Sequence, residues 1–151
     1  MAKMHSRAVG TSGSKRPLKR TKPSWVRFGS KEVELLVAKL AKEGKSPSKI
    51  GLHLRDVYGI PDVRVITQKK ICMILEEKGM RPKIPEDLHS LIKKSVTLQK
   101  HREENKKDNT SLRGLQLTES KIWRLVKYYK KVGRLPMDWK FDRQSIRLYA
   151  E

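Results

Sequence analysis

Three residue types that together can carry out nucleophilic catalysis lie close in the sequence, at His101, Asp108 and Ser111. In a serine-hydrolase triad the His removes the proton of the Ser and the Asp orients the His. The residues around Ser111 do not resemble the strand-to-helix turn that exposes a catalytic Ser. A turn at the tip of a thin helical hairpin also offers no pocket for a substrate. We therefore expect no catalytic residue and no enzymatic activity.

The same side chains can instead recognise RNA, because basic residues surround them at Lys106, Lys107 and Arg113. Short polar groups at a hairpin tip can enter the wide, shallow minor groove of an RNA helix, where 2′-hydroxyls and base edges are exposed. Asp108 could accept a hydrogen bond from a guanine amino group there, while lysines bind phosphates. The alternative is that Asp108 and Ser111 only cap the following helix. The residues alone favour neither interpretation, and one residue could serve both purposes.

The composition of the chain favours a polyanionic partner. Its 151 residues contain 36 Lys and Arg against 16 Asp and Glu, which gives a formal net charge of +20. A protein with such a field attracts polyanions, of which nucleic acid is the commonest. Hydrophobic residues make up only 36% of the chain. We therefore expect a small core and part of the length outside it.

Several other classes of protein are disfavoured. No run approaches the roughly 18 apolar residues of a transmembrane helix, so we expect no membrane partner. The His residues are too scattered for a familiar zinc spacing, and we expect no metal or cofactor. The single cysteine, Cys72, cannot form an internal disulfide, which is typical of a cytoplasmic protein. Its position beside an apolar stripe predicts a packing role.

The folded elements begin after a basic tail, residues 1–29. No acidic residue precedes Glu32, and Lys and Arg are interleaved with Gly, Ser and Pro. Because the tail has no apolar face, nothing offsets the entropy of ordering it. We expect it to be disordered and to thread along RNA. Trp25 and Phe28, at its end, are expected to dock on the folded part, with stacking on bases as the alternative.

Residues 30–80 are predicted to form a helical extension. Three short helices are expected, each with an apolar stripe that faces inward. The stripes consist of Val33, Leu36, Val37 and Leu40 in the first helix, Ile50, Leu54 and Val57 in the second, and Ile71, Ile74 and Leu75 in the third. Residues 60–66, which include Pro61, are expected to form an extended connection. Each helix begins at a capping residue and ends at a glycine: Ser30 to Gly44, Ser46 to Gly59, and Thr67 to Gly79. A helix, a Gly-containing turn and a following helix over 46–79 also fit a helix-turn-helix DNA-binding protein, in which Lys69 and Lys70 would open the recognition helix.

Residues 81–151 are predicted to form a long antiparallel helical hairpin in an all-α, four-helix arrangement. The prolines of the segment 81–85 break any helix. A helix follows and runs into a polar stretch at 101–105, and after the turn a second helix ends at Gly133. Two long helices joined by a short polar turn are typical of a hairpin. The outer face of the second helix is basic, with Lys121, Arg124, Lys127, Lys130, Lys131 and Arg134.

The stretch HREENKKDNTSLRGLQLTESKIWRLVKYYKK resembles the hairpin of the universal small-subunit ribosomal protein S-fifteen family. The shared motif is K-K-D-x-x-S-x-R-G-L. A His lies seven residues before its Asp, a Tyr lies fourteen residues after its Gly, and a basic residue lies three residues after that Tyr. The matching positions are His101, Lys106, Lys107, Asp108, Ser111, Arg113, Gly114, Tyr128 and Lys131. The rest is similar to the archaeal and eukaryotic form, called S-thirteen in eukaryotes, in P-S-W, S-P-S-K-I-G-L-H-L-R-D, P-E-D-L-H-S-L-I-K-K and R-L-P-M-D-W-K.

The resemblance implies a structural constituent of the small ribosomal subunit, cytoplasmic and on the ribosome, that supports assembly and translation. It implies binding to the central domain of the small-subunit rRNA, with His101, Asp108 and Ser111 in a minor groove and Tyr128 and Lys131 facing a three-way junction. Neighbouring ribosomal proteins are implied partners, and a contact with large-subunit RNA is a further expectation. The bacterial T-G-S-x-E-x-Q stretch is replaced here by residues 81–87, so its contacts cannot be transferred.

Overall fold

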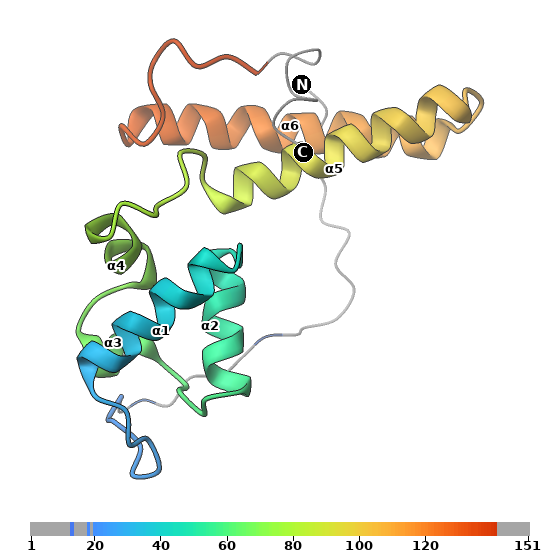
Figure 1. The fold of residues 1–151 in the computed structure, drawn as a ribbon. Helices are drawn as coiled ribbons and strands as arrows, with labels where there is room; N and C mark the ends of the chain where they lie inside the picture. Colours follow the sequence, from blue (N-terminus) through green and yellow to red (C-terminus); the bar gives the residue numbers. More distant parts are fainter. Residues whose placement is uncertain (1–12, 14–17, 19, 142–151) are drawn as a thin grey trace. The chain divides into compact units, whose positions relative to one another are not determined.

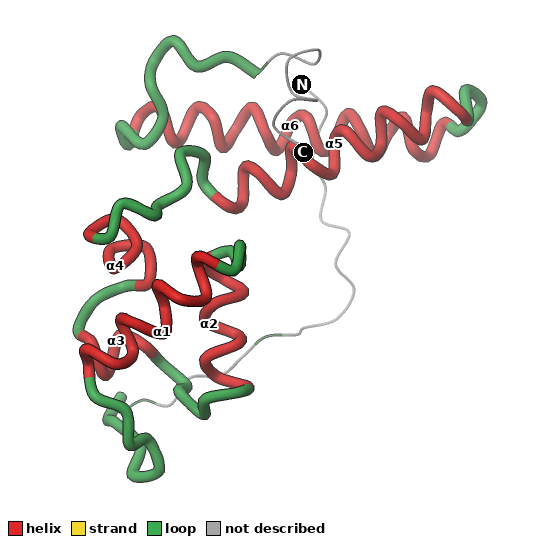
Figure 2. Tube along the Cα trace, viewed as in Figure 1, coloured by secondary structure: helices red, strands yellow, loops and turns green. Residues whose placement is uncertain are grey.

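The computed structural model describes residues 13, 18 and 20–141. The tail predicted to be disordered lies mostly outside the described residues, as do residues 142–151. Within the described range the chain contains six α-helices and no strand (Figures 1 and 2), which confirms the all-α class. The chain divides into two compact units that meet in sequence between Lys83 and Ile84. None of the helices in the described range is long and apolar enough to span a membrane.

The first unit contains four short helices, α1 (Ser30–Lys42), α2 (Pro47–Asp56), α3 (Val63–Thr67) and α4 (Ile71–Glu77). They enclose one apolar core, because each helix contributes residues from one face. The buried members include Val33, Val37, Leu40, Ile50, Leu54, Ile74 and Leu75, so the predicted apolar stripes are confirmed at these positions. Val57 is the exception, since α2 ends at Asp56 and the side chain of Val57 is exposed.

The predicted start of α1 is wrong by one residue, because its N-cap is Gly29 and Ser30 is its first residue. The carboxylate of Glu32 accepts a hydrogen bond from the Gly29 amide at 2.8 Å, which is the contact that the third helical residue makes to the N-cap in a capping box. The prediction for α2 is confirmed: Ser46 caps the helix and accepts from the Lys49 amide at 3.4 Å.

The extended connection predicted over residues 60–66 is wrong, because the short helix α3 occupies Val63–Thr67. Asp62 caps it by accepting from the Arg64 amide at 3.0 Å. Gln68 has φ of 58°, in the left-handed region, which ends α3 and delays the next helix until Ile71. Cys72 lies on the exposed side of α4, so its predicted packing role is wrong as well.

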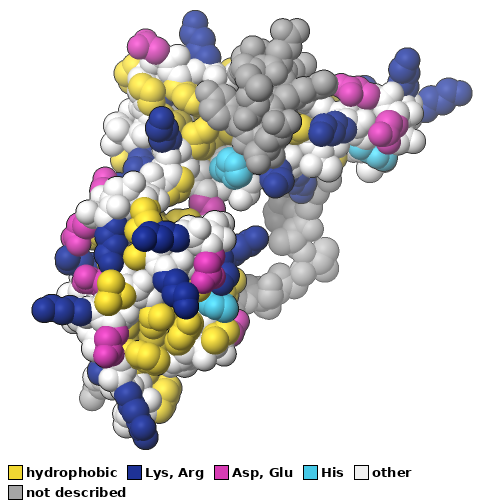
Figure 3. Space-filling model, viewed as in Figure 1, with side chains coloured by type: hydrophobic (Ala, Val, Ile, Leu, Met, Phe, Trp, Pro, Cys, Tyr) yellow, Lys and Arg dark blue, Asp and Glu magenta, His cyan; other side chains and the backbone are white. Residues whose placement is uncertain are grey.

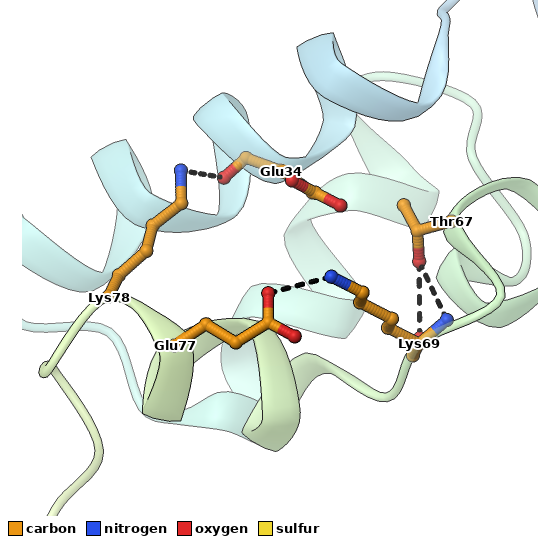
Figure 4. Close-up of polar contacts among 5 residues, drawn as sticks. All are labelled: Glu34, Thr67, Lys69, Glu77 and Lys78. Atoms are coloured by element: carbon orange, nitrogen blue, oxygen red, sulfur yellow. Dashed lines mark hydrogen bonds and ion pairs between the residues drawn. The ribbon is translucent and has the colours of Figure 1, made fainter.

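Polar contacts link the short helices at the surface (Figure 4). The Lys69 ammonium lies 2.7 Å from the Glu77 carboxylate, and Lys78 donates to the backbone carbonyl of Glu34 at 3.2 Å. The Thr67 hydroxyl donates to the Lys69 carbonyl at 3.1 Å and thereby shapes the turn between α3 and α4. Lys69, expected to open a recognition helix, is therefore already paired with a carboxylate. The helix that it precedes has only seven residues.

The second unit is built on α5 (Glu86–Glu104) and α6 (Asn109–Lys131), which lie side by side as an antiparallel hairpin (Figure 1). The predicted hairpin is confirmed. Its apolar core lies toward the open end, where Leu135 and Phe141 fold back after Gly133, which has φ of +71°. The other buried members are Leu88, Ile92, Val96, Ile122 and Val126.

Small polar side chains replace this core along the middle of the hairpin. Ser95, Thr118 and Ser120 are buried there. The hydroxyls of Thr118 and Ser120 donate to backbone carbonyls one turn earlier on α6, each at 2.9 Å. Small side chains let two helices approach closely. Leu115 is the buried apolar residue nearest to the tip, and hydrogen bonds in the turn add to its packing there.

Candidate nucleic-acid interface

Asp108 organises the turn between α5 and α6. It is the N-cap of α6, and its Oδ1 accepts a hydrogen bond from the Ser111 amide at 2.9 Å. Its Oδ2 lies 3.0 Å from Nε2 of His101, in the last turn of α5. The hydrogen bond from the Ser111 amide lowers the pKa of the Asp108 carboxyl below its usual value of 3.8, and the hydrogen bond with His101 lowers it further by a smaller amount. Asp108 is therefore ionised at neutral pH and fixed by one contact to each helix.

Asn105, the C-cap of α5, completes this network. Its side-chain amide nitrogen lies 3.2 Å from the backbone carbonyl of His101 and 3.4 Å from Nδ1 of the His101 ring. The tautomer of His101 with the proton on Nε2 satisfies both neighbours, because Nε2–H then donates to Asp108 and Nδ1 accepts from Asn105. The i, i+4 spacing of His101 and Asn105 on a helix end was the only sequence signal for this contact.

The triad interpretation fails on this geometry. Both nitrogens of the His101 ring face other residues, Asp108 and Asn105. In the described part of the chain the Ser111 hydroxyl makes no hydrogen bond to His101, and Ser111 meets Asp108 through its backbone amide instead. A general base must lie within hydrogen-bond reach of the proton that it removes. The alternative that Asp108 caps the following helix is confirmed, and the same carboxylate still has an exposed edge.

Exposed basic side chains surround the network. Lys106 and Lys107 lie in the turn, and Arg113 lies in the second turn of α6. Figure 3 shows acidic, basic and histidine side chains gathered at this tip of the hairpin. The side chains of His101 and Asp108 are 45% and 36% exposed. A polar, mixed-charge edge that solvent can reach is thus held between positive charges.

A second predicted group lies on the last turns of α6. It begins at Arg124 and continues three, four and seven residues later with Lys127, Tyr128 and Lys131. This spacing places the four side chains on one helix face. All four are exposed, and Tyr128 is 57% exposed. The only acid in α6 is Glu119, which is buried. The outer face of α6 is therefore a basic surface that contains an exposed aromatic ring.

The structure does not bring the two groups together. Ser111 and Tyr128 lie about 25 Å apart along α6, at a rise of about 1.5 Å per residue. A ligand that contacts both groups of residues must extend over about 25 Å and carry negative charge along that length. An extended polyanion meets this condition, and a small substrate does not.

Sequence reasoning missed a contact at the open end of the hairpin. The Tyr129 hydroxyl donates to the Asp87 carboxylate at 2.6 Å, which ties α6 to the first turn of α5. Burial, followed by the hydrogen bond to Asp87, raises the pKa of Tyr129 to about 12. The Asp87 carboxylate also accepts from the Leu88 amide at 2.8 Å. The two residues of the pair are far apart in sequence, and no local pattern signals them.

Comparisons with known proteins place the chain in a family. Residues 1–60 match the family described as "Ribosomal S13/S15 N-terminal domain", and residues 70–148 match "Ribosomal protein S15". The chain is 52% identical over 148 residues to the "Small ribosomal subunit protein uS15" of Methanocella arvoryzae, an alignment that covers 98% of this chain and 97% of that protein. The resemblance inferred from the hairpin motif is therefore confirmed, and the chain belongs to the ribosomal protein uS15 family of the small ribosomal subunit.

Proposed function

We propose that this protein binds the central domain of the small-subunit rRNA at a three-way junction and an adjacent minor groove, and so supports subunit assembly and translation on cytoplasmic ribosomes. The observation that carries the proposal is the carboxylate of Asp108. It is ionised, fixed by contacts to both helices and partly exposed within a basic tip. Capping alone does not require a charge here, because Ser or Asn would cap α6 about as well without repelling phosphate. A partly exposed carboxylate therefore favours directed hydrogen bonding over a nonspecific phosphate-binding surface.

Recognition begins with electrostatic capture. The exposed Lys and Arg side chains neutralise phosphates and release counterions, so affinity depends steeply on salt. For about 6–10 phosphates, affinity falls by roughly 10³–10⁵ between 50 and 200 mM salt. This step supplies affinity without sequence preference. Selectivity must come from groups with directed hydrogen bonds.

The hairpin tip supplies those directed groups. A carboxylate offers about four acceptor positions. In Asp108, Oδ1 accepts from the Ser111 amide and Oδ2 faces His101. The remaining positions can accept from a guanine amino group or a 2′-hydroxyl in a minor groove. The Ser111 hydroxyl and the His101 ring edge lie beside it as further polar groups. Lys106, Lys107 and Arg113 bind the flanking phosphates.

The second group contacts the junction. Arg124, Lys127 and Lys131 bind phosphates, and the exposed ring of Tyr128 stacks on an unpaired base, since junctions leave bases outside regular helices. The distance along α6 fits about one turn of an RNA helix between the two contacts. Neighbouring small-subunit proteins and, at a contact between the subunits, large-subunit RNA are further proposed partners. We propose no catalytic step and no metal or cofactor.

A salt-titrated binding assay tests this division of roles. The probes are a junction-containing fragment of the central domain, the same fragment with its minor-groove helix mutated, and duplex DNA. Asp108→Ala is expected to reduce discrimination between the two RNAs with little change in salt slope. Lys127→Ala is expected to weaken all ligands alike and to lower the slope by about one. Identical behaviour of the two variants, or equal affinity for duplex DNA, contradicts the proposal.

Cosedimentation tests the location of the protein. The full chain is expected to sediment with small subunits at moderate salt and to be released at high salt. Protein that remains free at every salt concentration contradicts a ribosomal role.

A further inference from the structure

Trp25 is an exposed aromatic residue that is nevertheless fixed. Its side chain is 69% exposed, while its indole Nε1–H donates to the Gly59 carbonyl at 3.1 Å. An indole has only this one donor. Because the donor is satisfied within the protein, a ligand can cover the ring face without leaving a buried N–H unpaired.

The backbone around Trp25 is also tied down. Val26, the next residue, is buried in the core of the first unit, and its amide donates to the Pro23 carbonyl at 3.2 Å. The Lys22 ammonium donates to the Phe28 carbonyl at 3.1 Å and closes the loop. The Phe28 ring packs edge-on against Tyr58, with 6.0 Å between centroids. The expected docking of this segment is thus confirmed for Phe28, whereas the ring of Trp25 is held at the surface.

The residues close to Trp25 in sequence are basic, which favours an anionic ligand. Arg20, Lys22 and Arg27 are exposed, and no acid precedes Glu32 in the sequence. The two acids close in sequence to Gly59 are both engaged: Asp56 pairs with Arg55 at 2.7 Å, and Asp62 caps α3. An exposed aromatic face with exposed basic residues close to it in sequence is the combination that binds single-stranded nucleic acid, through base stacking and phosphate contacts. Lys22 keeps donors for a phosphate, because an ammonium has three and only one is used on the Phe28 carbonyl.

We propose that Trp25 is a stacking platform for an unpaired nucleotide of RNA, with Arg27 and Lys22 binding the adjoining phosphates. The site lies in the first unit and is separate from the hairpin contacts proposed above. Paired bases cannot use it, because their faces are covered by their neighbours in the helix. Every base has a π-face, so the site tolerates any sequence. Its fixed position lowers the entropic cost of binding.

Fluorescence of the full chain tests the proposal directly. Trp123→Phe with Trp139→Phe leaves Trp25 as the only tryptophan of the three. The probe is short single-stranded oligoadenylate, which offers no minor groove to the hairpin tip. We expect quenching of Trp25 on binding and protection of the ring from a soluble quencher. Because this probe has no minor groove, the quenching does not depend on the hairpin contacts, so failure of the hairpin proposal does not affect this result.

Variants then separate stacking from charge. Trp25→Leu is expected to weaken oligoadenylate binding by about 5- to 150-fold at an unchanged salt slope, the range found for loss of one stacked base. Arg27→Ala is expected to lower the slope by about one and to keep the quenching. Circular dichroism checks that the Trp25→Leu chain is folded. Binding without quenching, a Trp25→Leu affinity equal to that of the parent, or Trp25-dependent self-association without RNA binding overturns the proposal.

Discussion

His101 Nε2 and Asp108 Oδ2 lie 3.0 Å apart across the turn that joins α5 to α6. His101 lies in the last turn of α5, and Asp108 is the N-cap of α6. The contact therefore fixes the direction of the Asp108 carboxylate before any ligand binds. A group that is already oriented loses less entropy on binding than a mobile one. The polar edge proposed to read an RNA groove is thus part of the folded hairpin itself.

The cap and the charge of Asp108 can be separated by two substitutions. Asp108→Ala removes the acceptor of the Ser111 amide, and loss of an N-cap costs about 1 kcal/mol of unfolding free energy. Asp108→Asn keeps a good capping side chain, so we expect its stability to stay within about 0.5 kcal/mol of the parent. Urea unfolding of the free protein measures both. Equal losses for Ala and Asn contradict the capping role.

The depressed pKa of Asp108 predicts an acid-dependent contribution to stability. The Ser111 amide, then His101, keep the folded carboxyl ionised below its usual pKa of 3.8. The unfolded chain takes up the proton first as the pH falls, so the contribution is fully present above the unfolded value and is lost through the lower folded value. We expect the stability advantage of the parent over Asp108→Ala to shrink below pH 3.8. An advantage that is constant or grows toward lower pH contradicts this sign.

The contact between Tyr129 and Asp87 should stabilise the open end of the hairpin. Tyr129→Phe removes the 2.6 Å hydrogen bond and leaves the ring in place. We expect a loss of about 0.5–1.5 kcal/mol in unfolding free energy. Tyr128→Phe is the matched control, because the Tyr128 ring is exposed and its hydroxyl makes no hydrogen bond in the described part of the chain. A control that loses as much stability as Tyr129→Phe excludes a role for the hydrogen bond.

The same hydroxyl predicts a signature at alkaline pH. Burial and Asp87 raise the folded pKa of Tyr129 from 10.0 to about 12. Since the proton is bound more tightly in the folded chain, the contribution to stability is complete below pH 10 and is lost as the pH rises toward about 12. A spectrophotometric tyrosinate titration should show one late-titrating group that Tyr129→Phe removes and Tyr128→Phe retains. Its persistence in Tyr129→Phe contradicts the assignment.

Local patterns in the sequence predicted most of the helices. Apolar residues at helical spacing identified α1, α2, α5 and α6, and the hairpin motif identified the family. Two errors, the connection predicted over residues 60–66 and the helix start predicted at Thr67, arose where the conformation of a single residue overrides the pattern of apolar residues. Asp62 starts a five-residue helix where Pro61 suggested an extended connection. Gln68 then adopts a left-handed backbone, which the sequence does not signal because the residue is not a glycine.

The sequence predicted which residues form the candidate site, but not how their side chains contact one another. The types and spacing of His101, Asp108 and Ser111 left a triad, a helix cap and an RNA contact open. Only the distances show that Asp108 is bonded by Ser111 through its amide and by His101 through its ring. The pairs formed by Tyr129 with Asp87 and by Trp25 with Gly59 join residues far apart in sequence. Such contacts follow from packing and carry no local signal.

Directed hydroxyl-radical probing tests the central claim, that the hairpin tip lies in a minor groove of the small-subunit rRNA. A Cys72→Ser chain with Asn109→Cys carries an iron chelate at the tip and keeps every proposed RNA-binding side chain. Lys94→Cys, exposed on α5, carries the matched control probe. The account predicts cleavage across the minor groove of a helix beside a three-way junction in the central domain, and a different pattern from the control. Cleavage confined to other domains, or the same from both probes, contradicts it.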